Sequence, residues 1–222
     1  MAMAIDIDRN RRFYMLGVIH RDERNREVLS RWIAGIGPDV ITLEFTQYGL
    51  MFREKNRDRY KKRIDEALEK LKNGKRYCSG SAIEALESFL NMPDEYEIAS
   101  GYCAERQLPF YLIDMDAFSC LKLQKVDELF DAGNIERLLT EENAGNGSGE
   151  ATMARLFFTS GIKTATYDDE MYVRDRHMAD RISLLMKHAP DKRFLHIAGW
   201  RHLEDPHNLY APLNPLKVFP YD

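Results

Sequence analysis

Short apolar runs alternate with amphipathic segments along most of this chain, and the alternation predicts an α/β fold. Buried strands are expected at four runs that are apolar and short, namely 13–19, 40–45, 109–113 and 194–198. Residues 217–219 are expected to add an edge strand. The spacing of strand, helix and strand at the start predicts that the first two strands form a parallel pair. We therefore expect a mainly parallel central sheet flanked by helices, with all four main strands pointing the same way.

Helical periodicity fills most of the chain between these strands. Apolar residues recur at helical spacing in six segments, namely 22–34, 52–73, 81–90, 95–106, 118–132 and 169–188. A further short helix is expected at 135–142. Residues 52–90 are predicted to be a helical insertion, or a lid over the site, within one α/β domain spanning 1–222. The basic run 53–63 inside it is interpreted as a solvated helix face, with the binding of an anionic partner as the alternative.

Composition narrows the class of protein. The 222 residues carry a formal net charge of −4, which argues against a dedicated nucleic-acid binder. No apolar run approaches the roughly 20 residues that cross a bilayer, and residues 1–12 show no signal-peptide pattern. Cys78, Cys103 and Cys120 lack metal-ligand spacing and are interpreted as reduced thiols. We expect a cytoplasmic protein with no membrane partner, and a homo-oligomer is left open.

Two copies of one motif end two of the predicted strands. Gly17-Val18-Ile19-His20 and Gly199-Trp200-Arg201-His202 both place a histidine three residues after a glycine. The glycine is expected to let the chain turn sharply as it leaves the strand. Glu44 ends the second strand, and a carboxylate in an apolar strand needs a partner. Since open α/β sheets bind ligands at the carboxyl ends of their strands, His20, Glu44 and His202 are predicted to share a site.

Other polar residues are candidates to support this site. Arg174 and Asp175 fall on the apolar stripe of 169–188, so Arg174 is expected to be buried and to contact Asp116 or Glu44. Such a pair either locks the helix to the sheet or orients a metal ligand or substrate. Asp114 and Asp116, after the third strand, are either site carboxylates or the cap of the next helix. His196, inside the fourth strand, is interpreted as a core histidine with its hydrogen bonds satisfied. The run 143–149, NAGNGSG, is expected to be a flexible loop and lacks the ending of a P-loop.

These residues together resemble the TraB/GumN/Tiki superfamily, which is linked to erythromycin esterases and ChaN-like proteins. The resemblance rests on segments in a shared order, namely Gly17 to His20, Glu44, Asp114 to Asp116, Arg174-Asp175 with Met178-Ala179, and Ala198 to His202. It is weak across 47–90, and Val173 stands where the superfamily's helix motif has a glutamate. The resemblance implies a hydrolase whose site contains His20, Glu44 and His202, supported by Gly17, Gly199, Arg174, Asp175 and Asp116.

Three functions are compatible with this set of residues. The first is a metal-dependent hydrolase of amide (peptide) or ester bonds, in which His20, Glu44 and His202 hold a divalent ion such as Mn, Co or Zn. The second is a metal-free hydrolase of the erythromycin esterase type, with His20 as base oriented by Glu44. The third is a non-catalytic protein that binds haem or another ligand. The expected substrate is a peptide or a small molecule.

Overall fold

The computed structural model describes residues 10–76, 78–140 and 168–221. The interpretations of 1–9 and of the loop 143–149 lie outside these residues. The described chain divides into two compact units. The first contains residues 10–45, 93–115 and 168–221, and the second contains the described residues of 46–92 and 116–140. Each unit is described by itself below.

The first unit is built on a five-stranded sheet. Its strands are β1 (Phe13–Val18), β2 (Val40–Leu43), β3 (Phe110–Leu112), β4 (Phe194–Gly199) and β5 (Leu216–Val218), and the order across the sheet is β3-β2-β4-β1-β5. Every pairing is parallel, so the predicted parallel sheet is confirmed. The expected pairing of the first two strands is wrong, because β4 lies between β1 and β2. All six residues of β4 are buried, as suits a strand at the centre of a parallel sheet.

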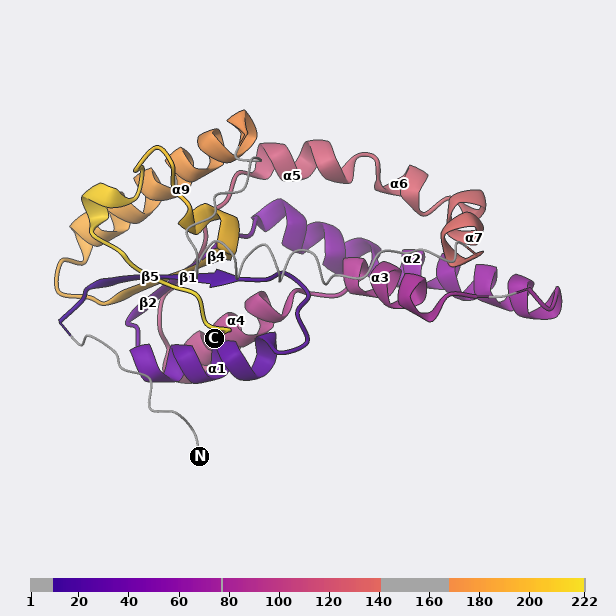
Figure 1. Ribbon diagram of the computed structural model, residues 1–222, viewed down its shortest axis with the longest axis horizontal. Coiled ribbons are helices and arrows are strands. Elements are labelled where there is room, and N and C mark those ends of the chain that lie inside the picture. Colours follow the sequence, from indigo (N-terminus) through magenta and orange to yellow (C-terminus); the bar gives the residue numbers. More distant parts are fainter. Residues whose placement is uncertain (1–9, 77, 141–167, 222) are drawn as a thin grey trace. The chain divides into compact units, whose positions relative to one another are not determined.

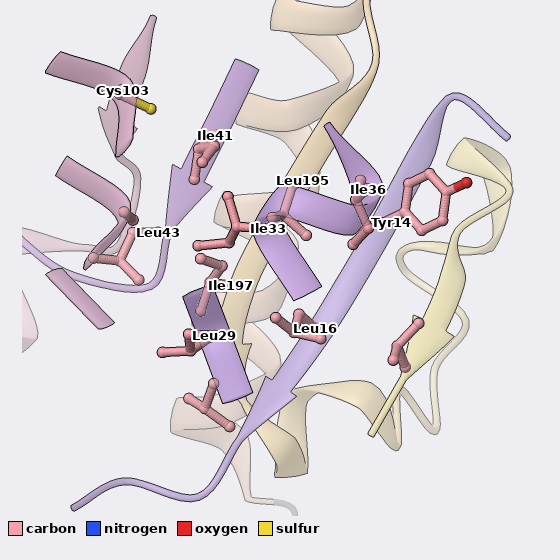
Figure 2. Close-up of a cluster of buried hydrophobic side chains, with 13 residues drawn as sticks. Tyr14, Leu16, Leu29, Ile33, Ile36, Ile41, Leu43, Cys103, Leu195 and Ile197 are labelled. Carbon is pink, nitrogen blue, oxygen red and sulfur yellow. The ribbon is translucent and has the colours of Figure 1, made fainter. Parts of the chain in front are cut away.

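Helices cover both faces of this sheet. In Figure 1, α1 (Asn25–Ile36) and α4 (Asp94–Arg106) lie on one face and α9 (Asp169–His188) lies on the other. Alternate strand residues therefore enter two different cores. Leu16 and Ile197 pack with Leu29 and Ile33 of α1 (Figure 2), whereas Met15 faces α9.

The second unit is helical. It contains α2 (Gln47–Asn73), α3 (Gly80–Leu90), α5 (Asp116–Leu123), α6 (Val126–Leu129) and α7 (Ala132–Thr140). Tyr60, Ile64, Phe130 and Ile135 are among the residues that form its own buried core. The single helix expected over 118–132 is divided between α5, α6 and the start of α7. The lid role given to 52–90 stays a prediction.

Candidate functional site

Three of the predicted site residues lie at one edge of the sheet because of its strand order. His20 follows the end of β1, Glu44 follows β2 directly, and His202 lies in the 3₁₀ helix η1 (Trp200–Leu203) that follows β4. Since the strands are parallel and β4 lies between β1 and β2, their carboxyl ends meet at this edge.

Glu44 and His202 are in direct contact. Nε2 of His202 lies 2.9 Å from Oε1 of Glu44, and both side chains are buried. The backbone N–H of Gly199 donates to Oε2 of Glu44 at 2.7 Å. Glu44 thus accepts hydrogen bonds from the end of β4 and from the helix that follows it, which fixes η1 relative to β2.

Arg174 supplies the positive charge of the predicted helix stripe. Its side chain is 15% exposed, and its Nη2 donates both to Oε1 of Glu44 and, at 2.7 Å, to Oδ2 of Asp114. Its Nε donates to Oδ1 of Asp114 at 3.0 Å, so Arg174 binds Asp114 in a bidentate manner through two parallel hydrogen bonds. The predicted contact with Glu44 is present, and the second carboxylate is Asp114, not Asp116.

Asp116 has a structural position instead. It is the first residue of α5, in the second unit, and its Oδ1 accepts a hydrogen bond from the backbone N–H of Tyr48 at 2.8 Å. A short carboxylate at the first turn of one helix therefore satisfies a free N–H group at the first turn of another. The alternative interpretation of Asp116 as part of a helix start describes this position better than the interpretation as a site carboxylate.

Asp175 holds the other side of His202. Its Oδ1 lies 2.5 Å from Nδ1 of His202 and accepts a hydrogen bond from the hydroxyl of Tyr210 at 3.0 Å. Asp175 is fully buried. Both ring nitrogens of His202 therefore face carboxylates, and since a carboxylate only accepts, the ring that satisfies both is the imidazolium.

The pKa shifts of these residues agree with this geometry. Burial lowers the pKa of His202, but the charge of Glu44 and the hydrogen bonds to Asp175 and Glu44 outweigh burial and raise it to about 10. Burial raises the pKa of Glu44, but the charge and hydrogen bond of His202 and the charge of Arg174 hold it well below its ordinary value. At neutral pH the cluster thus contains the cations Arg174 and His202 among carboxylates.

His20 has a different environment. Its side chain is 51% exposed, and its Nδ1 lies 3.1 Å from Oε1 of Glu95, whose side chain is 5% exposed. Because the carboxylate accepts, neutral His20 carries its proton on Nδ1 and its lone pair on Nε2. Nε2 lies toward Gly199 and Glu44, and the protonated form of His20 contributes to lowering the pKa of Glu44.

Glu95 was missed by the sequence analysis. It lies in the acidic first turn of α4, where carboxylates commonly face water and interact favourably with the helix dipole. Its pairing with His20 joins residues that are 75 positions apart. The available signal was that Glu95 lies four residues before Ala99 and eight before Cys103, on the buried stripe of α4, but this spacing does not identify His20 as its partner.

The two motif glycines act through close packing. Gly199 has a φ of −54°, which any residue adopts, so the expected role in a sharp turn is wrong there. A methyl group on Gly199 would lie 2.8 Å from Nε2 of His20, and one on Gly17 would lie 2.8 Å from Cδ2 of Leu203 and 3.1 Å from Cα of Trp200. Gly17 and Gly199 therefore allow η1 and the His20 ring to pack directly against the ends of β1 and β4.

His196 lies on the α9 face of the sheet, beside the charged cluster. It is fully buried, its Nδ1 lies 3.0 Å from Oγ1 of Thr42, and its ring stacks on Tyr210 with centroids 6.1 Å apart. Its Nε2 has no hydrogen-bond partner among the described residues. Only one of the two ring nitrogens therefore has the hydrogen bond that was predicted for a core histidine. Burial lowers the pKa of His196 to about 4, and the ring is neutral at physiological pH.

The donor set does not fit the predicted divalent ion. A histidine binds a metal as the neutral ring, through a nitrogen that carries no proton. Both nitrogens of His202 are engaged by carboxylates, and both oxygens of Glu44 accept hydrogen bonds. Within the described residues, no group of three His, Cys, Asp or Glu side chains is arranged to hold a metal ion. Haem ligation by His202 meets the same obstacle.

Comparisons with known proteins do not assign this chain to a family. No protein-family model, no curated protein and no solved structure matches the chain. In the part of the chain that the structure describes, no helix is long and apolar enough to span a membrane. The resemblance to the TraB/GumN/Tiki superfamily thus stays a prediction carried by the motif residues.

Proposed function

We propose that this chain is a hydrolase of ester or amide bonds in which His20 is the general base and no resident metal takes part. The observation that supports the proposal is the pair of His20 and Glu95. A half-exposed imidazole that can meet a substrate is held by a buried carboxylate, at the edge of the sheet where ligands of open α/β folds bind.

The proposed reaction is a direct attack by water. Nε2 of His20 takes a proton from a water molecule while the water oxygen bonds to the carbonyl carbon of the substrate. The bond from that carbon to the leaving oxygen or nitrogen then breaks, and the leaving group takes the proton from His20. Glu95 orients the ring and, together with the charge of Glu44, favours the imidazolium that forms between the two steps.

His202 is assigned a fixed electrostatic role in this proposal. Its charge and that of Arg174 hold Glu44 ionised beside His20. Because Glu44 also receives the N–H of Gly199, it is locked in place before any substrate binds. The predicted pairing of His20 with Glu44 is thus kept as a charge effect, while Glu95 makes the hydrogen bond to the His20 ring.

The test is an activity screen on protein that has been dialysed against a chelator. Nitrophenyl esters of increasing acyl length and peptide anilides supply the two bond classes. We expect hydrolysis that persists after chelation and falls by about 10²–10⁴-fold in His20→Ala, the range that a general base contributes. Glu95→Gln keeps an acceptor for Nδ1 but removes the charge, so an intermediate loss is expected.

His188→Ala is the matched control, because His188 is an exposed histidine at the end of α9 whose Nδ1 is bonded to the carbonyl of Leu184. Its hydrolysis rate should equal that of the unchanged protein. Activity that disappears on chelation and returns with Mn²⁺, Co²⁺ or Zn²⁺ would favour the metal-dependent hydrolase instead. A rate that His20→Ala leaves unchanged would overturn the assignment of the base.

A further inference from the structure

His20 sits at the corner of a tight turn. The backbone N–H of Asp22 donates to the carbonyl of Ile19 at 3.2 Å, which makes His20 and Arg21 the two central residues of the turn. Arg21 has a φ of 63°, in the left-handed region that residues other than glycine rarely adopt. Such a conformation persists only where the surroundings hold it, so contacts around Ile19 decide where the His20 ring can lie.

Two buried side chains hold both backbone groups of Ile19. The N–H of Ile19 donates to the hydroxyl of Tyr221 at 2.9 Å, and the carbonyl of Ile19 accepts from Nδ2 of Asn25 at 2.9 Å. The hydroxyl of Tyr221 in turn donates to Oδ1 of Asn25. Three residues therefore form a closed set of hydrogen bonds next to His20, although Tyr221 is 202 positions away from Ile19 along the chain.

Neither side chain is placed there by the local structure alone. β1 pairs with β4 as far as Val18 and with β5 as far as Leu16, so the N–H of Ile19 lies beyond both of these ladders. Asn25 is the first residue of α1, one position after the N-cap. An Asn side chain commonly caps a helix from the N-cap position itself. Its amide is directed to Ile19 and Tyr221 instead, and it is fully buried.

We propose that Asn25 and Tyr221 are positioning residues for His20, a proposal that rests on the function proposed above. Glu95 sets the rotation of the His20 ring, and the Asn25–Tyr221 pair sets the backbone from which the ring projects. The segment near the C-terminus thereby becomes part of the active site without touching substrate. Loss of the pair should let the turn relax and move Nε2 of His20 away from its place beside Gly199.

The variants are chosen to separate positioning from packing. Tyr221→Phe keeps the ring, which packs with Phe219 and lies under the guanidinium of Arg24 at 5.0 Å, and removes only the hydroxyl. Tyr60→Phe is the matched control: Tyr60 is a buried tyrosine of the second unit, and its hydroxyl accepts one hydrogen bond from Arg59 at 2.7 Å. Asn25→Ala and the double variant with Tyr221→Phe complete the set.

Two readouts are measured on the folded fraction of each variant: kcat and KM for the best ester of the screen, and the NMR signal of the Nδ1 proton that His20 shares with Glu95. We expect Tyr221→Phe to lower kcat by at least about tenfold with KM changed by less than about twofold, since a shift of the order of 1 Å can cost about 10²-fold. The His20 signal should weaken or move. The double variant should lose no more than the more damaging single change, because the two side chains act as one unit.

An unchanged kcat and an unchanged His20 signal, with only the thermal midpoint lowered, would reduce the pair to a structural role and overturn the proposal. Tyr60→Phe should leave both readouts as they are. If the unchanged protein hydrolyses none of the substrates, the proposed function fails, and the NMR signal alone then decides the positioning role: a signal altered in Tyr221→Phe supports it and an unaltered one refutes it.

Discussion

The substitution Gly199→Ala tests the candidate site at its tightest point. The added methyl group would lie 2.8 Å from Nε2 of His20 and 3.4 Å from Oε2 of Glu44. Ordinary contacts between nonbonded atoms lie at about 3.5–4.0 Å, so the His20 ring must move by roughly 0.7 Å or more. The ring can do so, because the side chain is half-exposed, but only by straining its hydrogen bond to Glu95.

The expected cost falls mainly on activity. Because His20 can swing toward solvent, overpacking should lower the free energy of unfolding by only about 1 kcal/mol, the low end of its usual range. A displacement of this size should lower kcat/KM by about 10²-fold. Gly17→Ala should instead affect mainly stability. Its methyl group would lie 3.1 Å from Cα of Trp200, and because backbone cannot move aside, the free energy of unfolding should fall by about 3 kcal/mol.

The assay pairs urea denaturation with ester hydrolysis on each glycine variant. Gly101→Ala is the control, because Gly101 lies inside α4 and nothing described lies within 4 Å of its added methyl group. It should gain up to about 1 kcal/mol from helix propensity and keep full activity. A Gly199→Ala protein that hydrolyses at the original rate would refute the placement of His20 against Gly199, and with it the geometry of the site.

Two further predictions concern the buried charges. The free energy of unfolding should peak near pH 6.5. Below that pH it should fall, because His196 takes up a proton in the unfolded chain but, with a folded pKa of about 4, not in the folded protein. Above that pH it should fall as well, because His202 loses its proton in the unfolded chain but keeps it in the folded protein up to about pH 10; each slope is about 1.4 kcal/mol per pH unit. Urea titrations from pH 5 to 9 measure this, and a stability that does not fall between pH 7 and 9 would contradict a cationic His202. Arg174→Met should cost about 3–5 kcal/mol, because it leaves the buried carboxylates Glu44 and Asp114 without their donor. The control Arg176→Met, on the exposed side of the same helix, should change stability by less than about 0.5 kcal/mol.

Periodicity was sufficient to predict the parallel sheet and most of its helices. The three inner strands β1, β2 and β4 are buried apolar runs, whereas the edge strands β3 and β5 are only partly buried. For the inner strands and for the apolar stripe of α2, the pattern in the sequence is the pattern of burial. The place of β4 between β1 and β2 could not be read in this way. Strand order depends on which faces and edges pack together, and a right-handed crossover from β1 can reach the adjacent position or the next one.

The chemistry of the site was less accessible than its location. The glycine-histidine motifs predicted that His20, Glu44 and His202 would lie at one edge of the sheet, and they do. The charged positions on 169–188 indicated that Arg174 needed a carboxylate. Which carboxylate it would be depended on where β3 ends, and Asp114 and Asp116 differ there by two residues. Glu95 could not be found, because a carboxylate in the first turn of a helix has an ordinary explanation that hides its pairing with His20.

The two histidines of the repeated motif illustrate why a shared pattern did not imply a shared role. His20 has a half-exposed ring whose Nδ1 lies beside Glu95, and in the proposed reaction its Nε2 exchanges a proton with a bound molecule. His202 lies between Glu44 and Asp175 with its pKa raised to about 10, so it keeps its proton throughout the physiological range. The spacing from glycine brings both rings to one edge, but the two rings differ in burial and in the carboxylates that contact them directly, and these decide whether a ring is suited to transfer protons or to hold a fixed charge. A metal would need both rings neutral, and this is why the environment of His202 favours a hydrolase that works with His20 alone.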